Sequence, residues 1–161
     1  AVMAVPGLLL ALLLVGTLGN GSGNAVIAIA VAFAPGMARV TRSVALAVRN
    51  QDYVKAAVAR GEGGSWIVFR EMLPNVMAPV VIEATIRVAF AVMLFATLSF
   101  LGLGAQPPSP EWGLMVAEAR QYVHQAPWVL IAPSLAIALT AIAFNLVGDG
   151  LRDALNPRHE R

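Results

Sequence analysis

Long apolar segments, separated by short polar ones, constrain the fold of this chain more than any other feature. The apolar segments cover residues 2–18, 24–40, 78–101 and 128–148. A helix rises about 1.5 Å per residue, so about 17 to 24 residues extend over roughly 25–36 Å, which matches a hydrocarbon core of roughly 30 Å. The pattern predicts an all-α, polytopic transmembrane helical bundle with four spans in one membrane domain over residues 1–161.

The composition agrees with this class. Hydrophobic residues make up 58% and charged residues 12% of the chain, whereas roughly a quarter of an ordinary soluble domain is charged. The mean hydropathy of +0.74 indicates spans along the whole length. No cysteine is present, which excludes disulfides and thiol chemistry. The basic residues lie next to apolar segments, which favours membrane orientation over nucleic-acid binding.

The distribution of basic residues predicts the orientation. The 102–127 loop contains only Arg120, and the 19–23 turn contains no Lys or Arg. The two basic regions hold Arg39, Arg42, Arg49, Lys55, Arg60 and Arg70, and, in the tail, Arg152, Arg158 and Arg161. By the positive-inside rule, the loop over about 41–77 and the C-terminus are expected to be cytoplasmic, and the loop over about 102–127 extracytoplasmic.

The N-terminal segment allows two interpretations. Residues 1–18 could be a signal peptide, but no basic region precedes the apolar run, so a first span is preferred. Ala1 stands where an initiator Met would be expected. We therefore expect the N-terminal part of a longer protein to be missing from this sequence.

The cytoplasmic loop has the pattern of two short amphipathic helices. Asn50 and Ser65 are the expected N-caps, as is Asn24 for the second span. Gly61 is expected to reverse the chain between the two helices. Pro74 is expected to end the second helix and direct the chain into the next span.

One side of the second short helix is apolar. Trp66, Phe69, Met72 and Leu73 form a stripe at helical spacing. Such a helix pair could lie on the lipid headgroups with Trp66 as an anchor. It could equally dock into a groove of a cytosolic protein.

Several motifs in this part of the chain resemble a known family. Ala56-Ala57, Gly61 and Leu73-Pro74-Asn75 resemble the EAA loop of inner-membrane permeases of ABC transporters. The resemblance continues through residues 98–104 (LSFLGLG), 107–113 (PPSPEWG), 126–128 (APW) and 144–158 (FNLVGDGLRDALNPR). Together they resemble the second permease subunit of dipeptide, oligopeptide and nickel importers. A full-length relative would have about six spans.

The resemblance implies a permease subunit of an ATP-driven importer for peptides or a similar small solute, in a bacterial or archaeal cytoplasmic membrane. Expected partners are a homologous permease, two ATP-binding subunits and an extracytoplasmic solute-binding protein. This chain would bind no cofactor, and ATP and magnesium would belong to the ATPase. The expected ATPase-coupling residues are Tyr53, Ala56, Ala57, Gly61, Trp66, Phe69, Leu73, Pro74 and Asn75.

At three positions the chain departs from the family pattern. Lys55 replaces the Glu that precedes Ala-Ala, and Glu71 replaces a His. We hypothesise that the two altered charges face complementary charges on the ATPase. Phe95 stands where the family commonly has a carboxylate, so part of the usual polar lining is absent or displaced.

The third span contains two charged residues on one helical face. Glu83 and Arg87 are four residues apart, in the order that favours pairing. They could line a translocation path together with Ser99 and contact a charged solute. Alternatively, they neutralise each other near the cytoplasmic interface, where the long Arg87 side chain could reach water.

The last helix end is polar. Contacts of this region with the EAA-like loop or the ATPase are one interpretation, and simple helix termination completed by Pro157 is the other. The candidate contact residues are Asn145, Asp149, Arg152 and Asp153.

The outer loop and the absent motifs argue against catalysis. A helix is expected from Glu111 or Trp112 to about His124. His124 is interpreted as a surface residue rather than a metal ligand, since no second ligand lies at the required spacing. The sequence contains no P-loop, GxSxG or HExxH motif. An intramembrane enzyme is therefore disfavoured, and a channel or membrane scaffold is the remaining alternative.

Overall fold

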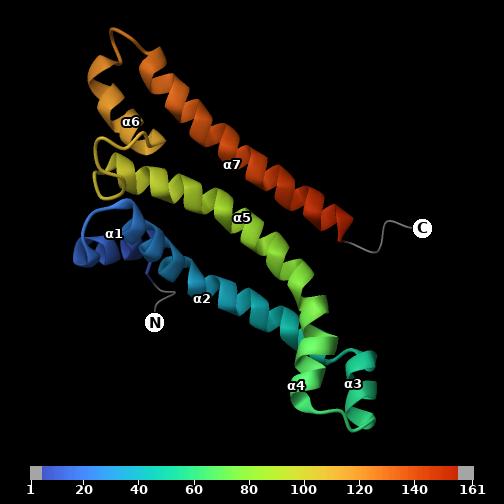
Figure 1. Ribbon diagram of the computed structural model, residues 1–161. Coiled ribbons are helices and arrows are strands. Elements are labelled where there is room, and N and C mark those ends of the chain that lie inside the picture. Colours follow the sequence, from blue (N-terminus) through green and yellow to red (C-terminus); the bar gives the residue numbers. More distant parts are fainter. Residues whose placement is uncertain (1–4, 156–161) are drawn as a thin grey trace.

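The computed structural model describes residues 5–155, and helices joined by short turns make up this part of the chain (Figure 1). The expected tail residues Pro157, Arg158 and Arg161 lie outside the described residues. The α-helices are α1 (Gly7–Leu18), α2 (Ser22–Arg49), α3 (Asp52–Ala59), α4 (Gly64–Trp66), α5 (Leu73–Phe100), α6 (Trp112–Ala119) and α7 (Trp128–Ala154). A π-helical segment, Ile67–Met72, joins α4 to α5, and a 3-10 turn, Arg120–Tyr122, follows α6. No strand occurs between residues 5 and 155, which confirms the all-α prediction.

Three helices are long and apolar enough to cross a membrane. They are Ser22–Arg49, the continuous helix Gly64–Phe100 and Trp128–Ala154, of 28, 37 and 27 residues. The segment predicted as a first span forms only the 12 residues of α1. At about 1.5 Å per residue, α1 is about 18 Å long and does not cross a core of about 30 Å by itself.

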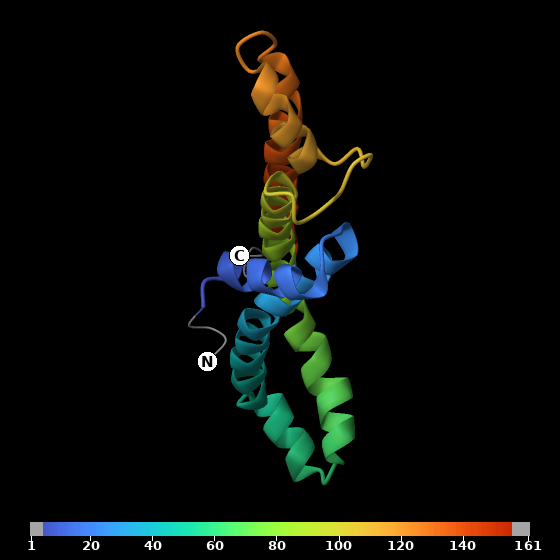
Figure 2. The same ribbon diagram turned by 90° about the vertical axis from the view of Figure 1, so that its left-hand side faces the viewer.

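The long helix through α5 is the centre of the molecule. It lies between α2 and α7, while α6 packs where α5 ends and α7 begins (Figure 1). α1 lies across the first half of α2 (Figure 2). The largest buried cluster joins α1, α2 and α5 through Ala11, Val15, Ala25, Ala28, Ile29 and Leu98. Half of these residues are alanines, whose small side chains let helix backbones approach closely.

The second span is longer than predicted. It was expected to end near residue 40, but α2 continues to Arg49 and so includes part of the predicted loop. Residues 45–47 (ALA) are strong helix formers, and no helix breaker occurs between residues 41 and 49. Pro35 lies inside the helix without ending it, as membrane helices tolerate when their neighbours compensate for the lost hydrogen bond.

The prediction that Pro74 ends a helix was wrong. Helix Gly64–Phe100 continues through this residue, directly after the π-helical segment. In that segment Leu73 donates its N–H to the carbonyl of Val68, five residues back. The wider π turn moves the preceding carbonyls away from the proline ring, and Pro74 has no N–H that needs an acceptor.

The predicted N-caps were also wrong. Asn24 lies inside α2, and its Nδ2 donates to the carbonyls of Leu18 and Gly19, each at 2.9 Å, so it completes the end of α1. Asn50 follows the last residue of α2, and Gln51 precedes α3. Ser65 lies within α4. The residues that precede α2, α3 and α4 are instead Gly21, Gln51 and Gly63, and none of them caps its helix with a side chain.

Candidate functional site

The elbow, defined here as residues 52–72, comprises α3, the turn at Gly61, α4 and the π-helical segment. Gly61 has a φ of +81°, which favours glycine, and its N–H donates to the Val58 carbonyl at 3.0 Å. Val54, Ala57 and Ile67 are buried between the two limbs. The small Ala57 side chain, with no exposed surface, permits this close packing.

Most of the predicted coupling residues lie on the outside of the elbow. Phe69 is 70% exposed, and Trp66 is 43% exposed. The other exposed members of the set are Tyr53, Ala56 and Gly61 in the elbow and Leu73, Pro74 and Asn75 directly after it. Ala57 alone faces inward. A large exposed apolar face on a small helical element marks an interaction surface with protein or lipid.

The predicted apolar stripe was wrong at one residue. Met72 packs inward against the buried elbow cluster rather than beside Trp66 and Phe69. The stripe was derived from the period of an α-helix, whereas residues 67–72 are π-helical and rotate the side chains differently.

A cavity of about 590 Å³ opens between the end of α2, α3 and the π-helical segment. Arg49 and Lys55 contribute its basic groups, while Val58, Ile67 and Val68 contribute apolar walls. This combination suits an acidic and apolar surface of a protein partner.

The two unusual charges of the elbow are paired within the chain. Lys55 Nζ lies 2.9 Å from Asp52 Oδ1. Glu71 Oε1 lies 3.7 Å from Arg60 Nη2, which also contacts Glu62 Oε1 at 2.8 Å. Arg60 thus connects the end of α3 to the π-helical segment. Exposed pairs of this kind contribute about 0–1 kcal/mol, so they orient the limbs rather than hold them together.

The end of α7 lies beside the start of α5. A cavity of about 420 Å³ is lined by Pro74, Asn75 and Pro79 of α5 and by Arg152 and Leu155 of α7. Asn75 Nδ2 donates to the Glu71 carbonyl at 2.8 Å. The structure therefore places one predicted tail residue, Arg152, next to the EAA-like motif.

The other predicted tail residues are exposed. The side chains of Asn145, Asp149 and Asp153 form no hydrogen bond or ion pair with any residue from 5 to 155. Gly148, between them, packs against α5, where an added Cβ would lie 3.5 Å from Thr85 Cγ2.

The three residues predicted to line a translocation path, Glu83, Arg87 and Ser99, do not lie together. Glu83 and Arg87 form the ion pair that their spacing predicts, with Oε1 2.7 Å from Nη2. Ser99 is completely buried, and its Oγ accepts a hydrogen bond of 3.1 Å from the Ala105 N–H. A side chain without exposed surface does not contact a solute in this conformation.

Two glycines that the sequence reasoning did not single out allow close packing where α5 ends and α6 begins. An added Cβ at Gly113 would meet the carbonyl oxygen of Ala96 and lie 2.7 Å from its Cα. An added Cβ at Gly104 would meet Ser99 Oγ. A glycine inside the predicted outer helix was the available signal, because such a glycine often marks a close backbone approach.

The outer helix begins where it was predicted. Glu111 caps α6 by accepting a hydrogen bond of 2.9 Å from the Leu114 N–H. It ends earlier than predicted, at Ala119, and Arg120 then stacks over the Phe100 ring at 4.6 Å.

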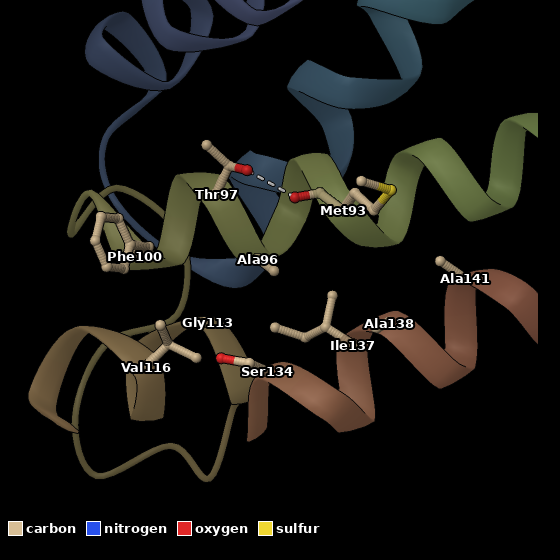
Figure 3. Close-up of a pocket in the computed structure, with 10 residues that line it drawn as sticks. All are labelled: Met93, Ala96, Thr97, Phe100, Gly113, Val116, Ser134, Ile137, Ala138 and Ala141. Atoms are coloured by element: carbon tan, nitrogen blue, oxygen red, sulfur yellow. Dashed lines mark hydrogen bonds between the residues drawn. The ribbon is translucent and has the colours of Figure 1, made fainter. Parts of the chain in front are cut away.

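A cavity of about 370 Å³ lies between α5, α6 and α7 (Figure 3). Its walls include Met93, Phe100 and Ile137. The hydroxyls of Thr97 and Ser134 each donate to a carbonyl of their own helix, at 2.8 Å. The cavity therefore suits apolar contacts. Within residues 5–155 no group of three His, Asp or Glu side chains could hold a metal ion.

The whole chain, residues 1–161, matches the family model of the binding-protein-dependent transport system inner membrane component. The chain belongs to this family. The match confirms the permease resemblance inferred from the EAA-like loop and the later motifs, and the three long apolar helices identify a multi-pass membrane protein.

Relatives within the permease family are about half identical to the chain. The di/tripeptide transport system permease protein DppC of Pseudomonas aeruginosa is 48% identical over 97% of this chain. The dipeptide transport system permease protein DppC of Escherichia coli is 46% identical over 97%, and the glutathione transport system permease protein GsiD of Pectobacterium atrosepticum is 46% identical over 96%. In each case the alignment covers 52% of the relative, so the chain spans about half the length of these proteins.

Proposed function

We propose that this chain is part of a permease subunit of an ATP-driven importer for small peptides, and that the elbow transmits motion from a cytosolic ATPase to the membrane helices. The relatives' names support the peptide class, because they transport dipeptides, tripeptides or glutathione. The chain performs no covalent chemistry in this proposal. ATP and magnesium are bound by the partner ATPase.

The observation that carries the proposal is the exposed aromatic face of the elbow. Trp66 and Phe69 are exposed, and the two residues between them in the sequence line the cavity that contains Arg49 and Lys55. The elbow is also continuous with α5, because helix Gly64–Phe100 is unbroken. A partner that binds the elbow and changes conformation would therefore move the span formed by α5.

We propose the following assembly and orientation. The elbow and the C-terminus are cytoplasmic, in the inner membrane of a bacterium or archaeon, as the clustering of Lys and Arg supports. The chain pairs with a homologous permease, two ATP-binding subunits and an extracytoplasmic solute-binding protein. Arg152, beside Pro74 and Asn75, links the end of α7 to the elbow side of the molecule.

We also propose that Glu83 and Arg87 belong to the wall between α2 and α5 that borders the translocation path. Their charge in a membrane span supports this, since such residues usually face a partner or a cavity. Ser99 supports the turn after α5 instead, because it is buried and bonded to Ala105.

The test is uptake of a labelled dipeptide, a labelled tripeptide and glutathione by the complete complex containing the full-length permease. We expect ATP-dependent uptake of at least one of them. Phe69→Asp should reduce it by about tenfold or more, the effect of about 1.4 kcal/mol, because it places a charge in an apolar docking face.

The matched control is Tyr122→Asp. Tyr122 is a 46% exposed aromatic residue at the opposite end of the molecule. This variant should still co-purify with the ATP-binding subunits, whereas Phe69→Asp should not. Equal co-purification and equal uptake for the two variants would refute the proposed role of the elbow.

A further inference from the structure

Arg87 of α5 rests directly on the backbone of α2 at Gly36. An added Cβ at Gly36 would lie 3.0 Å from Nη1 and 3.2 Å from Nη2 of Arg87. Nη2 also pairs with Glu83 Oε1 at 2.7 Å, and Nε is buried without a hydrogen-bond partner among the described residues. Glycine allows this close approach, because a methyl group at residue 36 would require the guanidinium to move by a few tenths of an ångström.

The contact lies deep in the membrane segment of both helices. Gly36 is about 21 Å from the start of α2 at Ser22, and Arg87 is about 20 Å from the end of α5 at Phe100, at 1.5 Å per residue. Both are therefore about two thirds of the way across a core of about 30 Å. The guanidinium is held by Glu83, which lies one helical turn closer to the start of α5.

The position of this contact relates it to the elbow. α2 leads into α3, and α5 continues from the π-helical segment, so the elbow joins these two long helices (Figure 2). We call α2 and α5 the two arms. The arms meet near the elbow, where Val48 of α2 and Met72 pack against the same buried cluster. They meet again at Gly36 and Arg87, about 18 Å further along α2 and about 22 Å further along the other helix.

We propose that Arg87 is a positioning residue that locks the two arms together, so that α2 and α5 move as one body when the elbow is pushed. The latch consists of Glu83, Arg87 and Gly36. This inference rests on the proposed coupling function of the elbow. Helices in lipid associate mainly through close packing, because lipid tails are as apolar as the side chains. Glu83 neutralises Arg87 within α5, and the guanidinium packs closely against α2 at Gly36.

The local weakness of α2 explains why a latch is needed there. Pro35, next to Gly36, has no N–H, so the carbonyl four residues earlier lacks its usual helical donor. A helix bends most easily at such a position. Without the latch, the part of α2 that follows Pro35 would bend away from α5. Motion of the elbow would then bend α2 instead of moving both membrane helices.

The test compares Gly36→Ala with Gly23→Ala in the full-length permease within the complete complex. Gly23 lies on the same helix, and nothing lies within 4 Å of its added Cβ. We expect Gly36→Ala to lower the amount of labelled peptide taken up per ATP hydrolysed by about fivefold, and Gly23→Ala to leave it unchanged. Adding Arg87→Lys to Gly36→Ala should restore most of the ratio, because the smaller ammonium keeps the charge and fits beside the new methyl group.

A second measurement does not depend on transport. Spin labels on cysteines introduced at Leu46 of α2 and Met77 of α5, which are 49% and 45% exposed, report the separation of the arms. Gly36→Ala should broaden this distance distribution, whereas Gly23→Ala should not. Identical distributions and identical coupling ratios for the two variants would overturn the latch. A wild-type complex that takes up no peptide would instead refute the proposed function, and the spin-label distances would still decide on the latch.

Discussion

At the residue scale, the contacts that hold the helices together depend on positions without a side chain. Gly113 lies against the Ala96 backbone, and Gly104 lies against Ser99. These contacts explain motifs that the sequence analysis recognised only by resemblance. The Glu83–Arg87 pair was predictable because its spacing is local to one helix. The partner of Gly113 was not, because it lies on another helix.

Gly113→Ala tests the approach of α6 to α5. The added methyl group would collide with the backbone of Ala96, and overpacking of this kind costs typically about 1–3 kcal/mol. We expect a lower midpoint of thermal unfolding for the purified full-length protein in detergent. The control is Gly150→Ala in α7, where an added Cβ meets nothing within 4 Å. Equal midpoints for the two variants would show that the contact is unimportant.

At the element scale, the π-helical segment is the largest departure from the predicted structure. The sequence predicted a short helix ended by Pro74, since a proline in the middle of an α-helix is costly. The helix instead continues through the proline with a changed hydrogen-bond register, which turns Met72 inward and leaves Phe69 exposed. A pattern with an α-helical period contains no information on such a change.

Pro74→Ala tests whether this register matters. Alanine restores an N–H and removes the ring, so an α-helical register becomes available to residues 67–72. The elbow would then turn relative to α5. We expect lower peptide uptake together with unchanged or higher thermal stability of the permease. Unchanged uptake in this variant would mean that the π-helical register has no part in coupling.

At the scale of the whole molecule, the structure is a long central helix that carries the exposed elbow at one end and the packed helix α6 at the other (Figure 1). The all-α class and the positions of the last two spans were predictable from apolar length alone. The short α1 and the extension of α2 to Arg49 were not, because hydropathy does not locate helix ends. The continuous helix from the elbow into α5 was not predictable either, because it depends on the π-helical segment before Pro74.

The most direct measurement of the central claim is cross-linking from the elbow. The sequence contains no cysteine, so Phe69→Cys and Tyr122→Cys each provide a single reactive site in this chain. In the assembled transporter, Phe69→Cys should cross-link to the ATP-binding subunit and react with an impermeant reagent from the cytoplasmic side, while Tyr122→Cys should do neither. A cross-link from Tyr122→Cys alone, or labelling of Phe69→Cys from outside the cell, would contradict the account.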